Sequence, residues 1–100
     1  MKRLFYSLLL SVLFVSCGVS PGDVITLSKD IPGADDRFNA MMITGYYDDG
    51  DAKKGTEMYY LGHAFLLEKG KKVRVLYVDS PYCQVSYNKQ VYWVHKKFLK

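Results

Sequence analysis

The last third of the chain, residues 71–99, restricts the possible folds more than any other stretch. Valine, tyrosine and other residues that favour extended structure dominate three short runs there, and residues that favour turns separate these runs. Between the second and third runs, Asn88 and Lys89 fit a two-residue hairpin turn, because asparagine tolerates the positive φ that such turns need. The sequence therefore predicts consecutive strands over residues 73–78, 82–87 and 91–94.

The middle of the chain extends this β pattern. Residues 40–47 are predicted to form a strand, and residues 48–55 a loop rich in aspartate and glycine. Residues 57–67 fit either one bent strand or two short strands that are separated at Gly62. Because no helical periodicity is sustained in these segments, we expect an all-β domain of about five strands over residues 40–100.

The first 16 residues have the three parts of a secretory signal peptide. Lys2 and Arg3 supply the positive start, residues 4–15 form a largely apolar run, and small residues follow at positions 16–18. A helix formed by the apolar run would be about 18 Å long, well short of the ~30 Å hydrocarbon core of a bilayer. A stable membrane-spanning helix is therefore not expected from residues 1–16.

The sequence Leu-Phe-Val-Ser-Cys at residues 13–17 resembles the lipobox of bacterial lipoproteins. The resemblance implies cleavage before Cys17 and attachment to a membrane through a lipid on this cysteine. Since residue 18 is glycine and not aspartate, it also implies attachment to the outer membrane, facing the periplasm. The alternative is ordinary secretion with cleavage near residues 16–18.

Residues 17–39 have the composition of a tether between the anchor and the domain. Proline, glycine and aspartate recur there, and only residues 24–27 have the pattern of a short strand or edge addition. Lipid on Cys17 would leave Cys83 without a partner for a disulfide bond. Cys83 is therefore expected to be a small, buried core residue.

Residues 69–99 resemble the bacterial Src-homology-3-like domain. They contain a Lys-Gly turn before a valine-rich strand, a second strand that begins with an aromatic residue, and Trp-Val before an aromatic-leucine pair. Tyr82 stands where the family usually has tryptophan, and Tyr92 where it has glycine. The resemblance implies a small β-barrel with a 3₁₀ turn near its end, which binds cell-wall peptides, a partner protein or a neighbouring domain. The matching positions are Gly70, Val73, Val75, Leu76, Tyr82, Val85, Trp93, Val94, Phe98 and Leu99.

The same resemblance implies a binding groove lined by aromatic side chains. Tyrosine and tryptophan offer a large contact area at low entropic cost together with one polar group, which suits recognition. The alternative is that the tryptophan and about half of the tyrosines fill the core of the small barrel. The residues that we assign to the groove are Tyr46, Tyr47, Tyr82, Tyr92 and Trp93.

No motif in the sequence indicates catalysis or metal binding. The chain has two histidines, His63 and His95, without HExxH or CxxC spacing. Asp49 cannot begin an EF-hand loop, because the twelfth position of that loop would be Tyr60 and not glutamate. Cys83 and His95 lie on neighbouring predicted strands and can be imagined as a nucleophile and its base, but the helix that carries the cysteine of papain-like enzymes is not predicted. We therefore expect no enzyme, no cofactor and no metal.

Charge is distributed unevenly along the chain. Residues 17–68 contain four basic and nine acidic residues, whereas residues 69–100 contain eight basic residues and one acidic residue. This asymmetry indicates either a surface that faces a polyanion or two halves that neutralise each other in the fold. For a secreted chain the counterpart would be an anionic glycan, a phospholipid headgroup or an acidic protein, and not a nucleic acid.

The sequence thus predicts an envelope lipoprotein with one small β-barrel. The barrel is expected to be a non-catalytic binding or scaffold module for a cell-wall peptide, such as that of peptidoglycan, or for a protein partner. The alternative is a secreted or lipid-anchored inhibitor or exclusion factor that acts on an envelope enzyme or on entry machinery.

Overall fold

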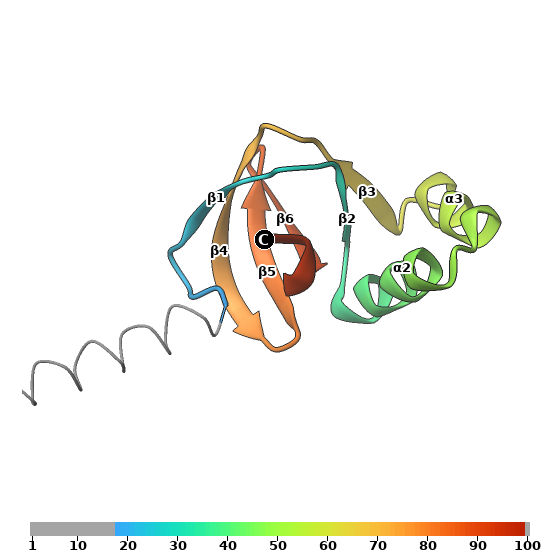
Figure 1. Ribbon diagram of the computed structural model, residues 1–100, viewed down its shortest axis with the longest axis horizontal. Helices are drawn as coiled ribbons and strands as arrows, with labels where there is room; N and C mark the ends of the chain where they lie inside the picture. Colours follow the sequence, from blue (N-terminus) through green and yellow to red (C-terminus); the bar gives the residue numbers. More distant parts are fainter. Residues whose placement is uncertain (1–17, 100) are drawn as a thin grey trace, which may run out of the picture.

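Figure 1 shows the computed structural model of the chain, which describes residues 18–99. Within this range the chain forms one open antiparallel sheet of six strands, two short helices and a final 3₁₀ turn. The strands are ordered β1-β4-β5-β6-β2-β3 in the sheet. A mainly β fold is thus confirmed, whereas the helices were not expected. The elements are β1 (Val24–Thr26), β2 (Ile31–Ala34), α2 (Arg37–Asp49), α3 (Ala52–Tyr60), β3 (Ala64–Leu67), β4 (Lys72–Asp79), β5 (Tyr82–Tyr87), β6 (Gln90–His95) and η1 (Lys96–Leu99).

The three strands predicted in the last third are confirmed as β4, β5 and β6, which pair in sequence order. Asn88 and Lys89 have φ angles of 51° and 65°, the positive values that a type I′ hairpin turn needs. A bulge between Val75 and Tyr77 shifts the register of β4 against β5. As a result Val75 pairs with Val85, whereas Tyr77 pairs with Gln84 on the opposite face of the sheet.

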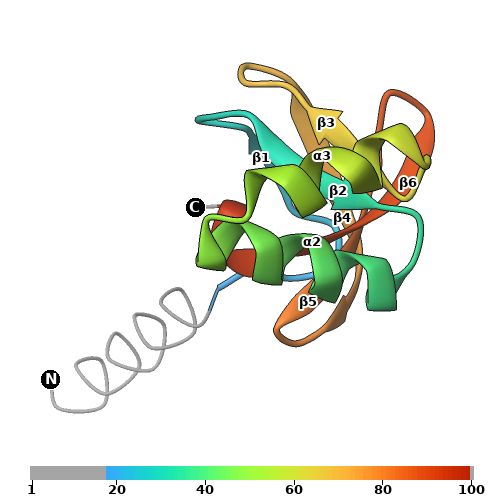
Figure 2. The same ribbon diagram turned by 90° about the vertical axis from the view of Figure 1, so that its right-hand side faces the viewer.

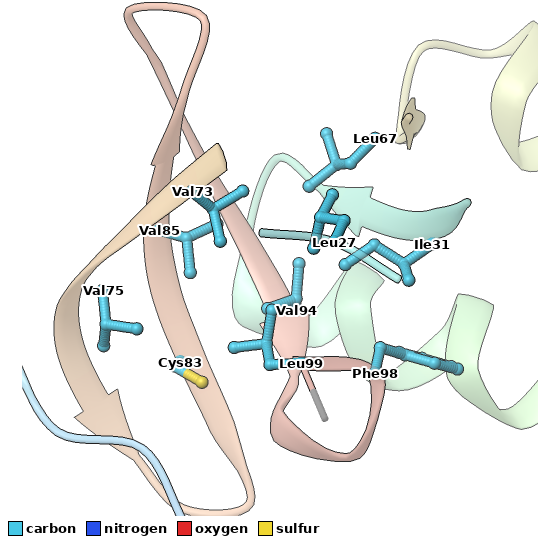
Figure 3. Packing of buried hydrophobic residues seen from close by; sticks show 10 residues of the cluster. All are labelled: Leu27, Ile31, Leu67, Val73, Val75, Cys83, Val85, Val94, Phe98 and Leu99. Atoms are coloured by element: carbon cyan, nitrogen blue, oxygen red, sulfur yellow. The ribbon is translucent and has the colours of Figure 1, made fainter. Parts of the chain in front are cut away.

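One hydrophobic cluster forms the main core, and its side chains define the inner face of the sheet. In β4 the alternation is regular at first, with Val73 and Val75 buried and Lys72 and Arg74 exposed. Since the cluster takes side chains from β2, β3, β4, β5 and β6, the sheet curves around it. Cys83 is buried with a free thiol, as predicted. The cluster, drawn in Figure 3, consists of Leu27, Ile31, Leu67, Val73, Val75, Cys83, Val85, Val94, Phe98 and Leu99.

Residues 40–47 lie in helix α2, so the predicted strand was wrong. The Asp36 side chain caps the start of the helix by accepting a hydrogen bond from the Asn39 backbone N–H at 2.7 Å. Gly50 ends it with a φ of 71° and an N–H that donates to carbonyls of the last turn. The caps and one buried helical face outweigh the β propensity of this segment. The buried residues of the face are Ala40, Ile43 and Thr44.

The loop predicted over residues 48–55 is also wrong, because most of it is helical. Only two residues connect the helices, and the second of them, Asp51, caps α3 by accepting a hydrogen bond from the Lys54 N–H at 3.1 Å. Of the predicted β segment 57–67, the first four residues belong to α3 and only Ala64–Leu67 forms a strand. The middle of the chain is therefore a helical hairpin inserted between β2 and β3.

Part of the segment that we assigned to the tether belongs to the sheet. The short strand predicted at residues 24–27 is confirmed as β1, which pairs with β4, and β2 pairs with both β3 and β6. The folded unit therefore begins well before residue 40. The predicted signal peptide at residues 1–16 and the predicted lipid site at Cys17 lie outside the described residues.

The helical hairpin packs against the outer face of the sheet, opposite the main core (Figure 2). Ala40 of α2 is buried against Ala34 and Tyr82, and Ile43 is buried with Met58 and Ala64. No helix within residues 18–99 combines the length and the apolar character needed to cross a membrane.

Candidate functional site

The five aromatic residues that were assigned to one groove lie in three different places. Tyr46 and Tyr47 are on α2, at the end that faces α3. Tyr82 and Trp93 are on the outer face of the sheet, beneath and beside α2. Tyr92 points to the inner face. The structure therefore does not bring these five side chains together in a single groove.

Tyr92 packs against the main core. Its ring centroid lies 5.2 Å from that of Phe65 and 6.1 Å from that of Tyr87. Because β6 alternates its side chains, Tyr92 and Trp93 must point to opposite faces of the sheet. Tyr92 therefore packs on the core, as the alternative interpretation predicts for about half of the tyrosines.

A pocket of about 290 Å³ lies between α2 and α3. Its walls are mainly the rings of Tyr46, Tyr47 and Tyr59, and Gly55 contributes backbone only. Gly55 is buried beside Ile43, so the helices approach each other closely there. Tyr59 was not among the predicted site residues, because its proximity to Tyr46 and Tyr47 depends on the pair of helices α2 and α3, which was not expected. The remaining lining residues are Gly50, Asp51, Ala52 and Thr56.

Two tyrosine hydroxyl groups provide the main polar feature of this tyrosine pocket. The hydroxyl oxygens of Tyr47 and Tyr59 lie 2.9 Å apart. Partial burial, and next the hydrogen bond with Tyr47, raise the pKa of Tyr59 above its ordinary value of 10.0. The Tyr59 hydroxyl therefore stays protonated, and the pair can both donate and accept. Aromatic walls with a few fixed polar groups are typical of pockets that bind small ligands or single side chains.

The outer face of the sheet carries a second aromatic group. Tyr82 is buried under α2, and the Arg37 guanidinium lies 4.9 Å from its ring centroid. Arg37 Nε also lies 2.8 Å from Asp79 Oδ2, an ion pair whose angle is not that of a hydrogen bond. Trp93, in contrast, is only partly buried, and its ring meets that of Tyr77 at 85° with centroids 6.2 Å apart.

Tyr77 was missed in the sequence analysis although 55% of it is exposed. Plain alternation from Val73 and Val75 would place Tyr77 on the inner face. The bulge after Val75 reverses this and turns the tyrosine outward, next to Trp93. The position of such a bulge has no clear signal in a single sequence.

Cys83 and His95 do not form the imagined nucleophile-base pair. Cys83 points into the core, and its partner across the strands is Val94, whereas His95 lies opposite Tyr82 on the outer face. Burial raises the pKa of the Cys83 thiol, which keeps it protonated. His95 Nδ1 instead accepts a hydrogen bond from the Lys97 N–H at 3.0 Å.

The other histidine is similarly occupied. His63 Nδ1 lies 3.5 Å from Asp35 Oδ2, with both side chains partly exposed. Within residues 18–99, no group of three or more histidine, cysteine or carboxylate side chains is arranged to hold a metal ion.

No protein-family model matches the chain, and neither does any curated protein or solved structure. Residues and geometry alone therefore indicate what the two aromatic sites can do.

Proposed function

We propose that this chain is an envelope lipoprotein whose folded part is a non-catalytic binding module. The tyrosine pocket between α2 and α3 would receive a side chain of its ligand, either a cell-wall peptide or a protein partner. A lipid on Cys17 would hold the module on a membrane, since buried acyl chains contribute about 0.8 kcal/mol per CH₂ group. The location would be the outer membrane, facing the periplasm.

The observation that carries the proposal is the tyrosine pocket itself. Three tyrosine rings line a mainly apolar space of about 290 Å³ that is open to solvent, close to the lower limit of typical ligand pockets. The paired hydroxyls of Tyr47 and Tyr59 can orient a bound peptide by donating and accepting hydrogen bonds. A space of this size suits one side chain better than a whole cofactor.

We also propose that the sheet is a modified Src-homology-3-like barrel. Support comes from the β4-β5-β6 meander and from the 3₁₀ turn η1, which ends in Phe98 and Leu99. The shared core of β2 through β6 is what a nearly closed barrel would need. The helical hairpin would then be an insertion that supplies the pocket.

Binding of the full chain in an uncharged detergent to purified peptidoglycan, and to proteins of an envelope extract, tests the proposal. Tyr47→Ala removes one wall of the pocket and should abolish retention. Tyr60→Ala is the matched control, because Tyr60 is 89% exposed on the same hairpin and does not line the pocket. Circular dichroism should show both variants folded. Retention of Tyr47→Ala at the level of the unmodified chain would contradict the proposal.

One further observation favours the alternative function, an inhibitor that docks on an envelope enzyme or entry protein. Phe38, Met41, Tyr60 and Leu61 are exposed apolar residues at the end of the hairpin where α2 begins and α3 ends. Exposed apolar groups of this kind are typical of protein-protein contacts. The same two variants separate the functions: an inhibitor would lose its protein partner with Tyr60→Ala and keep it with Tyr47→Ala.

A further inference from the structure

A second surface, distinct from the tyrosine pocket, lies on the outer face of β4, β5 and β6. Cross-strand pairing places its side chains in two adjacent rows. The first row contains Arg74, Ser86 and Val91. The second row contains Tyr77, Gln84 and Trp93. These six residues are called the outer strip below.

The aromatic part of the outer strip is open to solvent. Tyr77 is 55% exposed and Val91 is 49% exposed, while Trp93 is partly buried beside α2. The rings of Tyr77 and Trp93 stand almost perpendicular to each other, so that they form a corner and not two parallel platforms. Gln84 lies between them in the register and offers a neutral donor and acceptor.

A dense group of positive charges continues the outer strip at one end of the sheet. All five side chains of this group are exposed, and none forms an ion pair with another residue in the range 18–99. A polar hollow of about 200 Å³ at this end is lined by Glu68, Lys71, Lys72, Tyr87 and Asn88. The members of this basic end are Lys69, Lys71, Lys72, Arg74 and Lys89.

Few acidic groups oppose these charges. Glu68 lines the polar hollow, and Asp30 accepts a hydrogen bond from the backbone N–H of Lys69. Asp79, at the far end of β4, is already paired with Arg37. The positive charge of the basic end is therefore only partly compensated.

The combination of rings, neutral hydrogen-bonding groups and unpaired cations defines the chemistry of a ligand. The apolar face of a sugar ring packs on an aromatic side chain through dispersion and hydrophobic contacts. Sugar hydroxyls match Gln84 and Ser86, and carboxylates match arginine and lysine. Single-stranded nucleic acid would favour parallel rings for successive bases, which the corner of Tyr77 and Trp93 does not offer.

We propose that the outer strip and the basic end together bind an anionic polysaccharide. Tyr77 and Trp93 hold a sugar ring, and Arg74 and Lys72 pair with the carboxylates of neighbouring sugars. Lys72, Arg74 and, after the bulge, Tyr77 follow one another on the outer face of β4, so charge contacts and ring contacts can succeed each other along a linear polymer.

The position of the basic end also suits a polymer more than the surface of the anchoring membrane. Gly18 lies beside Lys96, whose N–H bonds to Pro81 in the β4–β5 turn. The basic end is at the opposite end of β5, about 20 Å away for a six-residue strand. Figure 1 shows the blue start of the described chain and the β4–β5 turn in the lower part of the domain, and the β3–β4 and β5–β6 turns at its top. This step rests on the proposed lipid anchor, whereas the binding assay below does not.

Trp93 is the only tryptophan of the sequence, so its fluorescence reports binding at the outer strip directly. The full chain in an uncharged detergent is titrated with polygalacturonate, with its fully methyl-esterified form, with polyglutamate and with oligo(dT). Polygalacturonate should change the Trp93 emission and bind most tightly, and added salt should weaken it. Equal binding of the methyl ester would overturn the role of the cations. Equal or tighter binding of polyglutamate or oligo(dT) would overturn the assignment to a polysaccharide.

Two pairs of variants locate the site. Lys72→Gln combined with Arg74→Gln should weaken polygalacturonate binding about tenfold, which corresponds to the loss of two solvent-exposed charge pairs. Lys53→Gln combined with Lys54→Gln on α3 changes the net charge equally and should leave the affinity unchanged. Tyr77→Ala should weaken polygalacturonate binding and leave polyglutamate binding as it is, with Leu66→Ala, at an apolar residue of β3 that is 48% exposed, as its control. Equal effects of the two charge variants would overturn the proposed site, whatever happens at the tyrosine pocket.

Discussion

The hydroxyl groups of Tyr47 and Tyr59 lie 2.9 Å apart and join α2 to α3 above the tyrosine pocket. Tyr59 is partly buried, and burial raises its pKa, so that its hydroxyl keeps its proton well into the alkaline range. The two helices otherwise meet the sheet through small clusters around Ala40 and Ile43. The shape of the pocket therefore depends on this hydrogen bond together with the packing of Gly55 and Met58 of α3 against Ile43 of α2.

Tyr59→Phe should lower the free energy of unfolding by about 1 kcal/mol, because it removes this hydrogen bond and leaves the Tyr47 hydroxyl without its partner. Chemical denaturation measures the change. Tyr60→Phe deletes the same oxygen from the next residue, which is 89% exposed, and should change stability little. Equal effects of the two substitutions would show that the contact does not stabilise the hairpin.

Two glycine substitutions should have opposite effects on stability. A Cβ at Gly33 would lie 3.1 Å from Leu67 Cδ1 and 3.2 Å from Tyr92 Cβ, closer than these atoms normally approach. Gly33→Ala should therefore destabilise the protein by about 1–3 kcal/mol through overpacking. A Cβ at Gly55 would meet Ile43 Cδ1 at 3.7 Å, an ordinary contact.

Gly55→Ala should instead stabilise the protein by up to about 1 kcal/mol, because alanine has the higher helix propensity. Thermal unfolding of both variants beside the unmodified chain measures the difference. A lower unfolding temperature for Gly55→Ala would mean that α2 and α3 are packed too closely for a methyl group.

The fold is predictable from the sequence where local signals and packing agree. In residues 72–95 the alternation of valines, the Ser80-Pro81 break and the Asn88-Lys89 turn all predict the observed meander. The helical hairpin is harder to predict, because Ile, Thr and Tyr have β propensity while burial follows a helical period. Asp36 and Asp51, each capping an N–H three residues later, were the signals that could have revealed both helices.

The candidate sites were harder to predict than the fold. Tyr46 and Tyr47 were chosen, but their partner Tyr59 comes from a helix that was not expected. Trp93 was chosen without Tyr77, because a bulge that reverses the side of a residue depends on the whole sheet. A list of aromatic residues along a chain does not contain this three-dimensional information.

The Cys83 thiol should be protected from reagents in the folded protein. Its side chain is buried, and burial raises its pKa, so little reactive thiolate is present at neutral pH. Iodoacetamide labelling of the peptide that contains Cys83, followed by mass spectrometry, should be slow without denaturant and rapid in guanidinium chloride. Rapid labelling of the native chain would indicate that this part of the core opens readily.

The stability of the fold should decrease on mild acidification because of His95. Partial burial, and then the positive charges of Lys97 and Lys96, lower the pKa of His95 below its ordinary value of 6.5, although Asp48 acts in the opposite direction. The unfolded chain therefore binds more protons than the folded one once the pH falls below 6.5. The contribution of His95 to the free energy of unfolding is complete above pH 6.5. It declines as the pH falls below 6.5 and is lost once the pH is below the pKa of His95 in the folded state.

Denaturation of the unmodified chain and of His95→Gln between about pH 8 and about pH 5 measures this effect, and the variant should lose less stability on the acid side. Glutamine has a similar size and no titrating group, and loss of the hydrogen bond from the Lys97 N–H should lower stability by the same amount at each pH, so the pH dependence stays interpretable. His63→Gln is the control, because His63 lies apart from His95 and pairs with Asp35. An acid-side loss in His95→Gln as large as that of the unmodified chain would mean that another group senses the pH.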